Sequence, residues 1–586
     1  MKPFNTAKIV SVIFIGLLLT CVTGFASQTE VIDPNLEAML QSSTPDEEIS
    51  VIVTLADKVD LKEFKNANKA FLRAMIIRAL KNKADLTQVT VQTFLKAKGV
   101  KRIVTLWLIN GVTVTAPVDV LHELARLPGI ESIRLDNRLS VPEVLSAIPA
   151  VPEWNINVIR APELWALGYT GSNVVIASMD TGVDINHPDL NIKWRGGPNS
   201  WFDPNGQHST PYDAKGHGTQ TMGVIVGGDD GGTAIGVAPG AKWITVKIFN
   251  DSGTATYSAI HQGFQWLLDP DGNADTNDAP DVVNNSWGLD SMNGCSTEFQ
   301  PDIQTLKASG IAVTFSAGNY GPNRSTSVSP ANNSGSFAAG ATDYLNQIAS
   351  FSSRGPSACD GNIYPEVVAP GVNIRTTDLT FGGVFPDSYV NVSGTSFAAP
   401  HVSGAVALLL DAFPDLTLSE LESALKQSST DLGIAGPDND HGYGLVDVMK
   451  AYEFISNSVI CTDSDGDGYF AESGCSTAQD CSDDDLTVYP NAPETKHDGI
   501  DQDCNGYDLT INILKALYIN KRDTLSVEAT SALGRNANLT LVGYGSMAWN
   551  KKTSKWALTI SRVGGNPETV TVSGIEGSES AQTIVK

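Results

Sequence analysis

The order of hydrophobic and polar positions first predicts a small mixed domain at the N-terminal end. Between about residues 28 and 145, the apolar runs "EISVIVTL" and "RIVTLWLINGVTVTAP" alternate with two helical stretches. One is rich in Lys and Ala and extends to about residue 98, the other reads "VDVLHELARLPG", and the strand "IESIRLDN" follows it. The order β-α-β-β-α-β predicts an α+β domain of the split βαβ, ferredoxin-like type.

From about residue 150 to 457 the pattern changes. Strands that are apolar throughout, such as "VVIASMD", "WITVKIF", "PDVVNNS" and "IAVTFSAGN", alternate with helical stretches. A strand without polar alternation is buried on both faces, which is typical of a parallel sheet between two helix layers. This segment is therefore predicted to be an α/β domain.

Two smaller segments follow. Residues 461–508 contain thirteen Asp or Glu against a single Lys, Lys496, and few apolar residues, so disulfides or a metal must hold this segment together. Residues 509–586 alternate apolar and polar positions in "TLSVEAT", "NLTLVGY", "KWALTIS" and "ETVTVSG". This alternation predicts an antiparallel β-module.

The first 26 residues have the pattern of a secretory signal peptide. Lys2 and Lys8 precede an apolar core, and Gly24 and Ala26 occupy small-residue cleavage positions. The core is shorter than the roughly 20 residues that span a bilayer, so we expect removal and a mature start near Ser27. Cys21 as a lipoprotein attachment site is the alternative, although Thr20 is a poor residue to precede it.

Charge and cysteines narrow the class of protein. Asp and Glu outnumber Lys and Arg by 65 to 39, and the excess lies after residue 150, which disfavours nucleic acid and anionic membranes as partners. Six cysteines follow the leader, an even number that predicts disulfides in an oxidising compartment. Cys295 and Cys359 are the two in the α/β segment and are expected to pair. Those at 461, 475, 481 and 504 leave three connectivities open.

The stretch "NVSGTSFAAPHVSG" contains Ser396 directly before the apolar run "AVALLL". By itself such a serine is more often a helix cap than a nucleophile. Elsewhere, "IASMDTGVDINHPDL" places Asp180 at the end of an apolar strand, and "AKGHGTQTMGVI" brings His217 to a helix start. D-T-G is also the aspartic-protease motif, but that chemistry needs two such carboxylates facing each other.

These motifs occur in the order Asp180, His217, Asn319 (in "FSAGNYGP"), Ser396. With "HPDL", "GVAPGA", "FSSRGP" and "VAPGV", residues 150–457 resemble the subtilisin-like serine proteases, or subtilases. The run "LLDPDGNADTNDAPDVVNNSWG" is most similar to the bacillopeptidase F branch of that family. The resemblance implies a subtilisin-like parallel sheet and a peptidase.

Chemistry and resemblance together suggest the roles of the four residues. A serine hydroxyl is a weak nucleophile until a base removes its proton, so His217 is expected to act as base and then as acid. Asp180 would orient the imidazole. The resemblance implies that the oxyanion of the tetrahedral intermediate accepts hydrogen bonds from the Asn319 side chain and the Ser396 backbone N–H. Ser396 would then be both a helix start and the nucleophile.

The resemblance also implies that substrate is held as an added strand between two backbone edges. These edges would be Ser252, Gly253 and Thr254 on one side and Ser286, Trp287 and Gly288 on the other, with Ser316, Ala317 and Gly318 as a pocket wall. Val328 stands where the family often has glycine, and we expect it to narrow the primary pocket unless loop differences place another residue there.

The N-terminal domain, residues 27–147, resembles the inhibitor propeptide of this family. Such a propeptide templates folding and leaves its C-terminal tail in the active site, so processing is expected between about residues 138 and 155. An accessory domain retained in the active enzyme is the alternative.

Metal ligands are predicted at three places. "DSDGDG" (Asp463, Asp465, Asp467) and "DQDCNG" (Asp501, Asp503, Asn505) have the start of an EF-hand loop but lack Glu at the twelfth position. The segment instead resembles Asp- and Cys-rich metal-binding modules of exported bacterial proteins, and Ca²⁺ suits its oxygen donors. Asp189 matches a family calcium ligand, and Asp269, Asp271, Asn273 and Asp275 form a weaker candidate loop that could be a simple turn.

The sequence thus predicts a secreted, autoprocessed serine endopeptidase acting on proteins or peptides, inhibited by its own propeptide and free of the membrane after signal removal. The expected domains are 1–26 signal, 27–147 propeptide, 150–457 peptidase, 461–508 calcium-binding module and 509–586 β-module. The alternative function is a calcium-dependent surface-binding protein with an inert protease-like domain.

Overall fold

The computed structural model describes residues 31–65, 69–143, 145–146, 154–289, 291–457, 464–470 and 480–586. The contacts divide the chain into two units, Met1–Tyr452 and Glu453–Lys586. The predicted signal peptide lies outside the described residues. No helix in the described part of the chain is long and apolar enough to cross a membrane.

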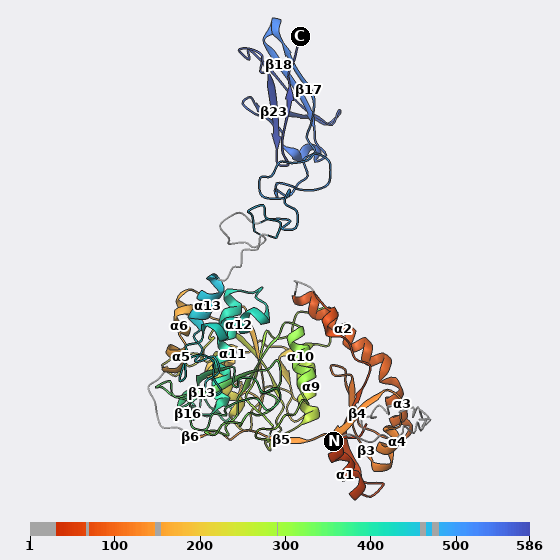
Figure 1. Cartoon of the computed structure of the whole chain (residues 1–586), viewed down its shortest axis with the longest axis vertical. Coiled ribbons are helices and arrows are strands. Elements are labelled where there is room, and N and C mark those ends of the chain that lie inside the picture. Colours follow the sequence, from red (N-terminus) through yellow and green to blue (C-terminus); the bar gives the residue numbers. More distant parts are fainter. Residues whose placement is uncertain are drawn as a thin grey trace, which may run out of the picture. The chain divides into compact units, whose positions relative to one another are not determined.

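The N-terminal domain has the predicted α+β arrangement (Figure 1). Its antiparallel sheet has the order β2-β3-β1-β4. The strands are β1 (Glu48–Leu55), β2 (Ile103–Leu106), β3 (Gly111–Pro117) and β4 (Ile130–Leu135). The helices are α2 (Lys69–Thr87), α3 (Val89–Ala97) and α4 (Val118–Leu124). The ferredoxin-like prediction is confirmed.

An additional helix, α1 (Pro34–Ser42), precedes the first strand and was not predicted. Asp33 caps it by accepting hydrogen bonds from the backbone N–H groups of Asn35 and Leu36, and Pro34 is its first residue. A capping Asp before Pro is a recognised helix start. The sequence therefore contained a local signal for this helix.

The second domain is built on a parallel sheet of seven strands in the order β14-β13-β12-β11-β7-β9-β8. Its strands are β7 (Val175–Asp180), β8 (Trp201–Phe202), β9 (Lys242–Lys247), β11 (Val282–Asn285), β12 (Ala312–Ser316), β13 (Phe337–Thr342) and β14 (Val367–Pro370). All of them except the two-residue strand β8 are buried almost throughout. The predicted α/β class is confirmed.

Helices cover both faces of this sheet. On one face, α8 (His217–Val226) and α11 (Thr395–Ala412) pack against the central strands, and on the other lie α9 (Tyr257–Leu268) and α10 (Gln300–Ala308). The other helices of this part of the chain are α5 (Trp154–Val158), α6 (Ala161–Ala166), α7 (Pro188–Asn191), α12 (Leu418–Ser428) and α13 (Val448–Asn457).

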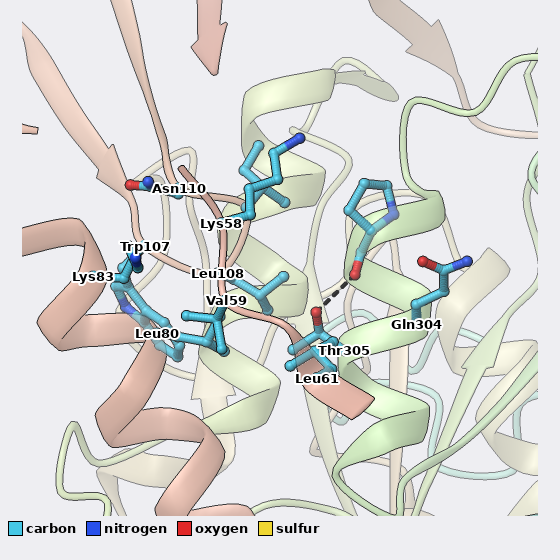
Figure 2. Close-up of a pocket in the computed structure, with 12 residues that line it drawn as sticks. Lys58, Val59, Leu61, Leu80, Lys83, Trp107, Leu108, Asn110, Gln304 and Thr305 are labelled. Atoms are coloured by element: carbon cyan, nitrogen blue, oxygen red, sulfur yellow. Dashed lines mark hydrogen bonds between the residues drawn. The ribbon is translucent and has the colours of Figure 1, made fainter. Parts of the chain in front are cut away.

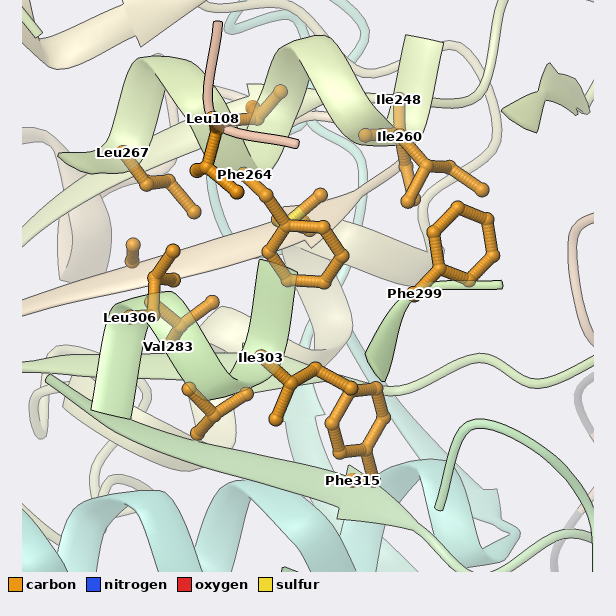
Figure 3. Close-up of a cluster of buried hydrophobic side chains, with 14 of the residues drawn as sticks. Leu108, Ile248, Ile260, Phe264, Leu267, Val283, Phe299, Ile303, Leu306 and Phe315 are labelled. Atoms are coloured by element: carbon orange, nitrogen blue, oxygen red, sulfur yellow. The ribbon is translucent and has the colours of Figure 1, made fainter. Parts of the chain in front are cut away.

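The N-terminal domain shares one apolar core with α9 and α10. Figure 3 shows Leu108, from the turn between β2 and β3, beside Phe264 and Leu267 of α9. A pocket of about 260 Å³ remains between the two domains, lined by Lys58 and Trp107 on one side and Thr305 of α10 on the other (Figure 2). Because apolar burial is the main favourable term in association, this contact holds the two domains together firmly.

The predicted disulfide between Cys295 and Cys359 is present and closes a loop of 64 residues. In the second unit Cys481 pairs with Cys504, which agrees with one of the three connectivities left open by the sequence. Cys461 and Cys475 lie outside the described residues.

The C-terminal residues form the predicted β-module. A five-stranded sheet has the order β21-β22-β18-β17-β25 and a four-stranded sheet the order β20-β19-β23-β24. The strands are β17 (Asn512–Ile519), β18 (Thr524–Thr530), β19 (Thr540–Leu541), β20 (Gly545–Ser546), β21 (Ala548–Asn550), β22 (Lys555–Ser561), β23 (Thr569–Gly574), β24 (Gly577–Gln582) and β25 (Ile584–Val585). All pairs are antiparallel except β17 with β25. Trp556 belongs to the core between the sheets.

Candidate active site

Asp180 and His217 meet at the carboxyl end of the parallel sheet. Asp180 is the last residue of β7, and His217 is the first residue of α8. The His217 Nδ1 lies 2.8 and 3.0 Å from the two carboxylate oxygens of Asp180. Both side chains are almost completely buried. This contact holds the imidazole with its Nε2 directed away from the carboxylate.

The local sequence around His217 fixes the start of α8. The carboxylate of Asp213 accepts backbone hydrogen bonds from Lys215, Gly216 and Thr219, which satisfies donors at the helix N-terminus. The Gly218 N–H donates to the Thr181 hydroxyl at 2.8 Å, which ties the helix start to the residue after Asp180. The two motifs are therefore joined by their own flanking residues.

Burial and charge act on His217 in opposite directions. Burial disfavours the imidazolium, but the negative charge of Asp180 and its hydrogen bond outweigh that effect, so the pKa of His217 is raised above its ordinary value. The Nε2 atom is buried and has no hydrogen-bond partner among the described residues. A buried nitrogen left without a partner is available to exchange a proton with a reacting group.

Ser396 is the second residue of α11 and is buried. Its hydroxyl donates to the Ser286 carbonyl at 3.3 Å, and the Ser286 hydroxyl donates to the Ser396 carbonyl at 2.8 Å. The helix begins after Gly394, whose φ of 152° suits glycine. In this structure the Ser396 hydroxyl is hydrogen-bonded to the Ser286 carbonyl and not to His217. Proton transfer to His217 needs a direct hydrogen bond between the hydroxyl and the imidazole.

Asn319 is held by a residue that the sequence analysis did not single out. Its Oδ1 accepts hydrogen bonds from the backbone N–H and the hydroxyl of Thr395, each at 2.9 Å. Because the oxygen is occupied, the Nδ2 group is left as a donor on the side of Ser396. Thr395 stands within the "SGTSF" motif, so its position beside the nucleophile was visible in the sequence.

A pocket of about 500 Å³ lies beside Ser396. Its lining includes seven of the predicted residues: Trp287, Gly288, Ser316, Gly318, Asn319, Val328 and Ser396. Val328 is buried between two glycines, since a methyl group added at Gly318 or Gly288 would come within 2.8 or 3.2 Å of it. Val328 therefore forms part of the wall of this pocket.

The other predicted substrate residues lie around this pocket and do not line it. Ala317 is fully buried, and its carbonyl accepts a hydrogen bond from the Tyr364 hydroxyl. Ser252, Gly253 and Thr254 lead into β10 (Thr254–Thr256), which forms an edge pairing with the N-terminal domain.

The end of the N-terminal domain runs through the site. β5 (Arg138–Ser140) pairs antiparallel with β10, and the Val141 N–H donates to the Gly253 carbonyl at 2.8 Å. Residues 140–143 line the same pocket as Ser396. Farther on, β6 (Leu145–Ser146) pairs with β16 (Tyr389–Ser393), the strand that precedes α11. The described residues on either side of position 144 thus pair with β10 and with β16, the strand that leads to Ser396.

A second contact fastens this segment to α9. The Asp136 carboxylate accepts from the backbone N–H and the hydroxyl of Ser258, at the start of that helix. Burial raises the pKa of Asp136, although the bonds from Ser258 oppose the shift. Arg134 also pairs with Glu298 of the α/β domain at 2.9 Å.

The predicted metal ligands separate into groups. One oxygen each from Asp465, Asp467 and Asp480 lie within 4.8 Å of one another, and so do those of Glu494, Asp501 and Asp503. Asp480 and Glu494 were not predicted, although both belong to the same acidic segment. Asp463 lies outside the described residues, and Asn505 contributes its backbone N–H to Asp501 and Asp503.

The other two predicted metal sites lie in the α/β domain. Asp189 is buried, and its oxygens accept from the Asp230 N–H and the Tyr389 hydroxyl. Among the described residues it belongs to no group of three or more candidate metal-ligating side chains. In the loop after α9, Asp278 joins Asp269 and Asp271, whereas Asp275 pairs with Arg78 and does not belong to that group. The Asn273 side chain accepts a hydrogen bond from the Asp275 N–H at 3.2 Å.

Comparison with known proteins agrees with this geometry. The model of the subtilase family matches residues 171–444, and a model described as a metal-binding motif matches residues 480–508. Bacillopeptidase F of Bacillus subtilis is 37% identical over 424 residues, which cover 66% of this chain and 29% of that protein. Subtilisin E of the same organism is 34% identical over 346 residues, covering 58% of this chain and 81% of subtilisin E. Subtilisin of Bacillus pumilus is 37% identical over 301 residues, or 98% of its length.

Proposed function

Because the chain belongs to the subtilase family, we propose that it is a secreted serine endopeptidase made as an autoprocessed zymogen. The observation that carries the proposal is the contact of His217 with Asp180 at 2.8 Å beside a pocket that contains Ser396 and Asn319. Its substrates would be proteins or peptides bound as an added strand along β10.

The proposed reaction starts with transfer of the Ser396 proton to His217 Nε2 while the oxygen attacks a peptide carbonyl. Asp180 stabilises the imidazolium that forms. The oxyanion of the tetrahedral intermediate would accept hydrogen bonds from Asn319 Nδ2 and the Ser396 N–H. The imidazolium then gives its proton to the leaving amine, and a water molecule repeats the sequence to release the acyl group.

We propose that the N-terminal domain is the inhibitor propeptide and that Ser396 cuts the segment between residues 143 and 145. Pairing of β5 with β10 before this segment, and of β6 with β16 after it, supports the assignment. A domain retained for another purpose would not need its residues 140–143 to line the pocket that contains Ser396.

The test of the proposed function is covalent labelling. A serine-directed fluorophosphonate should label the processed protein at Ser396, located by peptide mapping, and should abolish casein hydrolysis. Pepstatin, which acts on aspartic proteases, should have no effect. Labelling absent from correctly folded, processed protein would favour the rival function of a surface-binding protein with an inert protease-like domain.

Peptidase activity should fall as the pH drops through the pKa of His217, because only the neutral imidazole accepts the serine proton. Since Asp180 raises that pKa, the midpoint is expected above the ordinary value of about 6.5. The measurement is kcat/KM on a peptide substrate from pH 5 to 9, with circular dichroism to verify folding. A profile that stays flat over this range would contradict the assignment of His217 as the base.

We propose Ca²⁺ as the ion of the 464–508 module, since its two acidic clusters offer carboxylate oxygens and Ca²⁺ accepts six to eight such ligands in flexible geometry. Its cysteines Cys481 and Cys504 are joined in a disulfide, so they do not offer thiolates to zinc. Without an ion the clustered carboxylates repel one another.

Chelation should therefore expose the module to cutting by added trypsin or Glu-specific protease. A free Ca²⁺ concentration 100-fold above Kd adds about 2.7 kcal/mol to the stability of a binding domain, and EGTA removes that contribution. The experiment uses the Ser396→Ala full chain to prevent self-cleavage. Asp467→Asn should be cut even with Ca²⁺, whereas Asp484→Asn, outside the clusters, should behave like its parent. Identical cleavage with and without EGTA would leave the segment as an acidic linker.

A further inference from the structure

The loop that follows α9 holds a group of carboxylates remote from the active site. One oxygen each from Asp269, Asp271 and Asp278 lie within 4.8 Å of one another. Asp269 is 6% exposed, and its Oδ1 has no hydrogen-bond partner in the described part of the chain. A buried carboxylate oxygen without a donor requires a compensating positive charge.

In this structure that charge comes from the N-terminal domain. The ammonium group of Lys81, on α2, bonds to Asp269 Oδ2 and lies 3.0 Å from the Gly272 carbonyl oxygen. One turn earlier on the same helix, Arg78 pairs with Asp275. Lys81 thus bonds to two oxygen atoms of the loop, one carboxylate and one carbonyl.

The loop has an excess of negative charge. Arg195 is the nearby cation of its own domain, and it donates to the Asp278 backbone carbonyl at 2.5 Å. Departure of α2 would remove Lys81 and Arg78 together and leave the Asp269 carboxylate without its cationic partner.

We propose that this loop is a divalent-cation site, and that Lys81 occupies it until the N-terminal domain leaves. The donors are the carboxylates of Asp269, Asp271 and Asp278 with the Gly272 carbonyl, all oxygen atoms, which suits Ca²⁺. The inference rests on the proposed function in one respect, which is that the N-terminal domain is a removable propeptide.

The consequence is a mutual antagonism between the cation and the propeptide. Because Lys81 and Ca²⁺ require the same oxygens, each lowers the affinity of the other by the same factor. Calcium in the exterior medium would then favour propeptide release by filling the site that α2 vacates, while a calcium-poor compartment would keep the inhibitor in place.

The direct test counts bound Ca²⁺ and needs no activity. Three full-chain proteins, all with Ser396→Ala, are compared by equilibrium dialysis against micromolar to millimolar ⁴⁵Ca²⁺: the parent, a Lys81→Gln/Arg78→Gln variant, and that variant with Asp271→Asn added. The second protein should bind one more Ca²⁺ per chain than the parent at saturation, and the third should lose that extra ion. Ions held by the 464–508 module contribute equally to all three.

The matched control is Lys83→Gln. Lys83 is on the same helix but pairs with Asp57 of its own domain, so its removal changes the net charge without opening the loop. It should leave the count unchanged. No extra ion in the Lys81→Gln/Arg78→Gln protein, or an equal gain with Lys83→Gln, would overturn the proposal. Asp271 is exposed, and circular dichroism of each protein would show that loss of the ion is not loss of the fold.

A second arm uses the active chain. If Ser396 cuts the junction as proposed, propeptide release from the purified wild-type protein should be faster in 1 mM Ca²⁺ than in EGTA, and Lys81→Gln should release quickly in both. The dialysis result stands even if no processing occurs, so failure of the proposed function and failure of this inference are distinguishable. Release that is equally slow in Ca²⁺ and EGTA, with processing intact, would contradict the antagonism.

Discussion

Replacing the nucleophile, Ser396→Ala, should abolish proteolysis and leave the full chain unprocessed. The expected loss in kcat is on the order of 10⁶-fold, a figure measured on subtilisin itself, a relative of this chain. The reason is that Ser396 contributes the only atom proposed to form the acyl bond, and the same oxygen is proposed to cut between residues 143 and 145. Casein hydrolysis and the mass of the purified protein measure both effects.

The control for this variant is Ser429→Ala. The Ser429 hydroxyl donates to the Leu425 carbonyl at 2.7 Å at the end of α12, away from the pocket. That protein should process normally and retain its activity. Proteolysis or self-processing by the purified Ser396→Ala protein, once contaminating proteases are excluded, would show that the mechanism is wrong.

Asp180→Asn should lower kcat by about 10⁴-fold with little change in KM, as measured for this residue type in serine proteases. The Asp180 carboxylate accepts a hydrogen bond from the His217 Nδ1–H, which leaves Nε2 unprotonated and free to take the serine proton. An amide in its place would donate to Nδ1 and put the proton on Nε2, the wrong tautomer. Because the charge of Asp180 raises the pKa of His217, the acid limb of the remaining activity should also move to lower pH.

Asp343→Asn is the matched control for this change. The Asp343 carboxylate accepts backbone bonds from Leu345 and Gln347 in a surface turn and takes no part in the site. Its kcat and pH profile should equal those of the wild type. An Asp180→Asn enzyme with wild-type kcat would mean that another group orients His217.

The sequence alone determined the family and most of the helices and strands, with α1 (Pro34–Ser42) as an exception. Asp180 at the end of an apolar strand and Ser396 before an apolar run were both apparent from local order, because strand and helix periods are properties of neighbouring residues. The ferredoxin-like order, the parallel sheet and the Cys295–Cys359 pair were predictable in the same way, the last because the α/β segment holds two cysteines.

Only the tertiary structure decided which distant groups meet. Lys81 and Asp269 are 188 residues apart in the sequence. Nothing in the spacing of "DPDGNAD" shows that the negative charge of this loop pairs with a lysine on a helix of another domain. For the same reason the acidic group of this loop includes Asp278 and not Asp275, and Asp480 and Glu494 belong to the clusters of the module. Hydrophobic periodicity reports only on residues close together in the sequence. These contacts instead depend on how separately folded surfaces and loops pack, and such packing leaves no repeating pattern in the sequence.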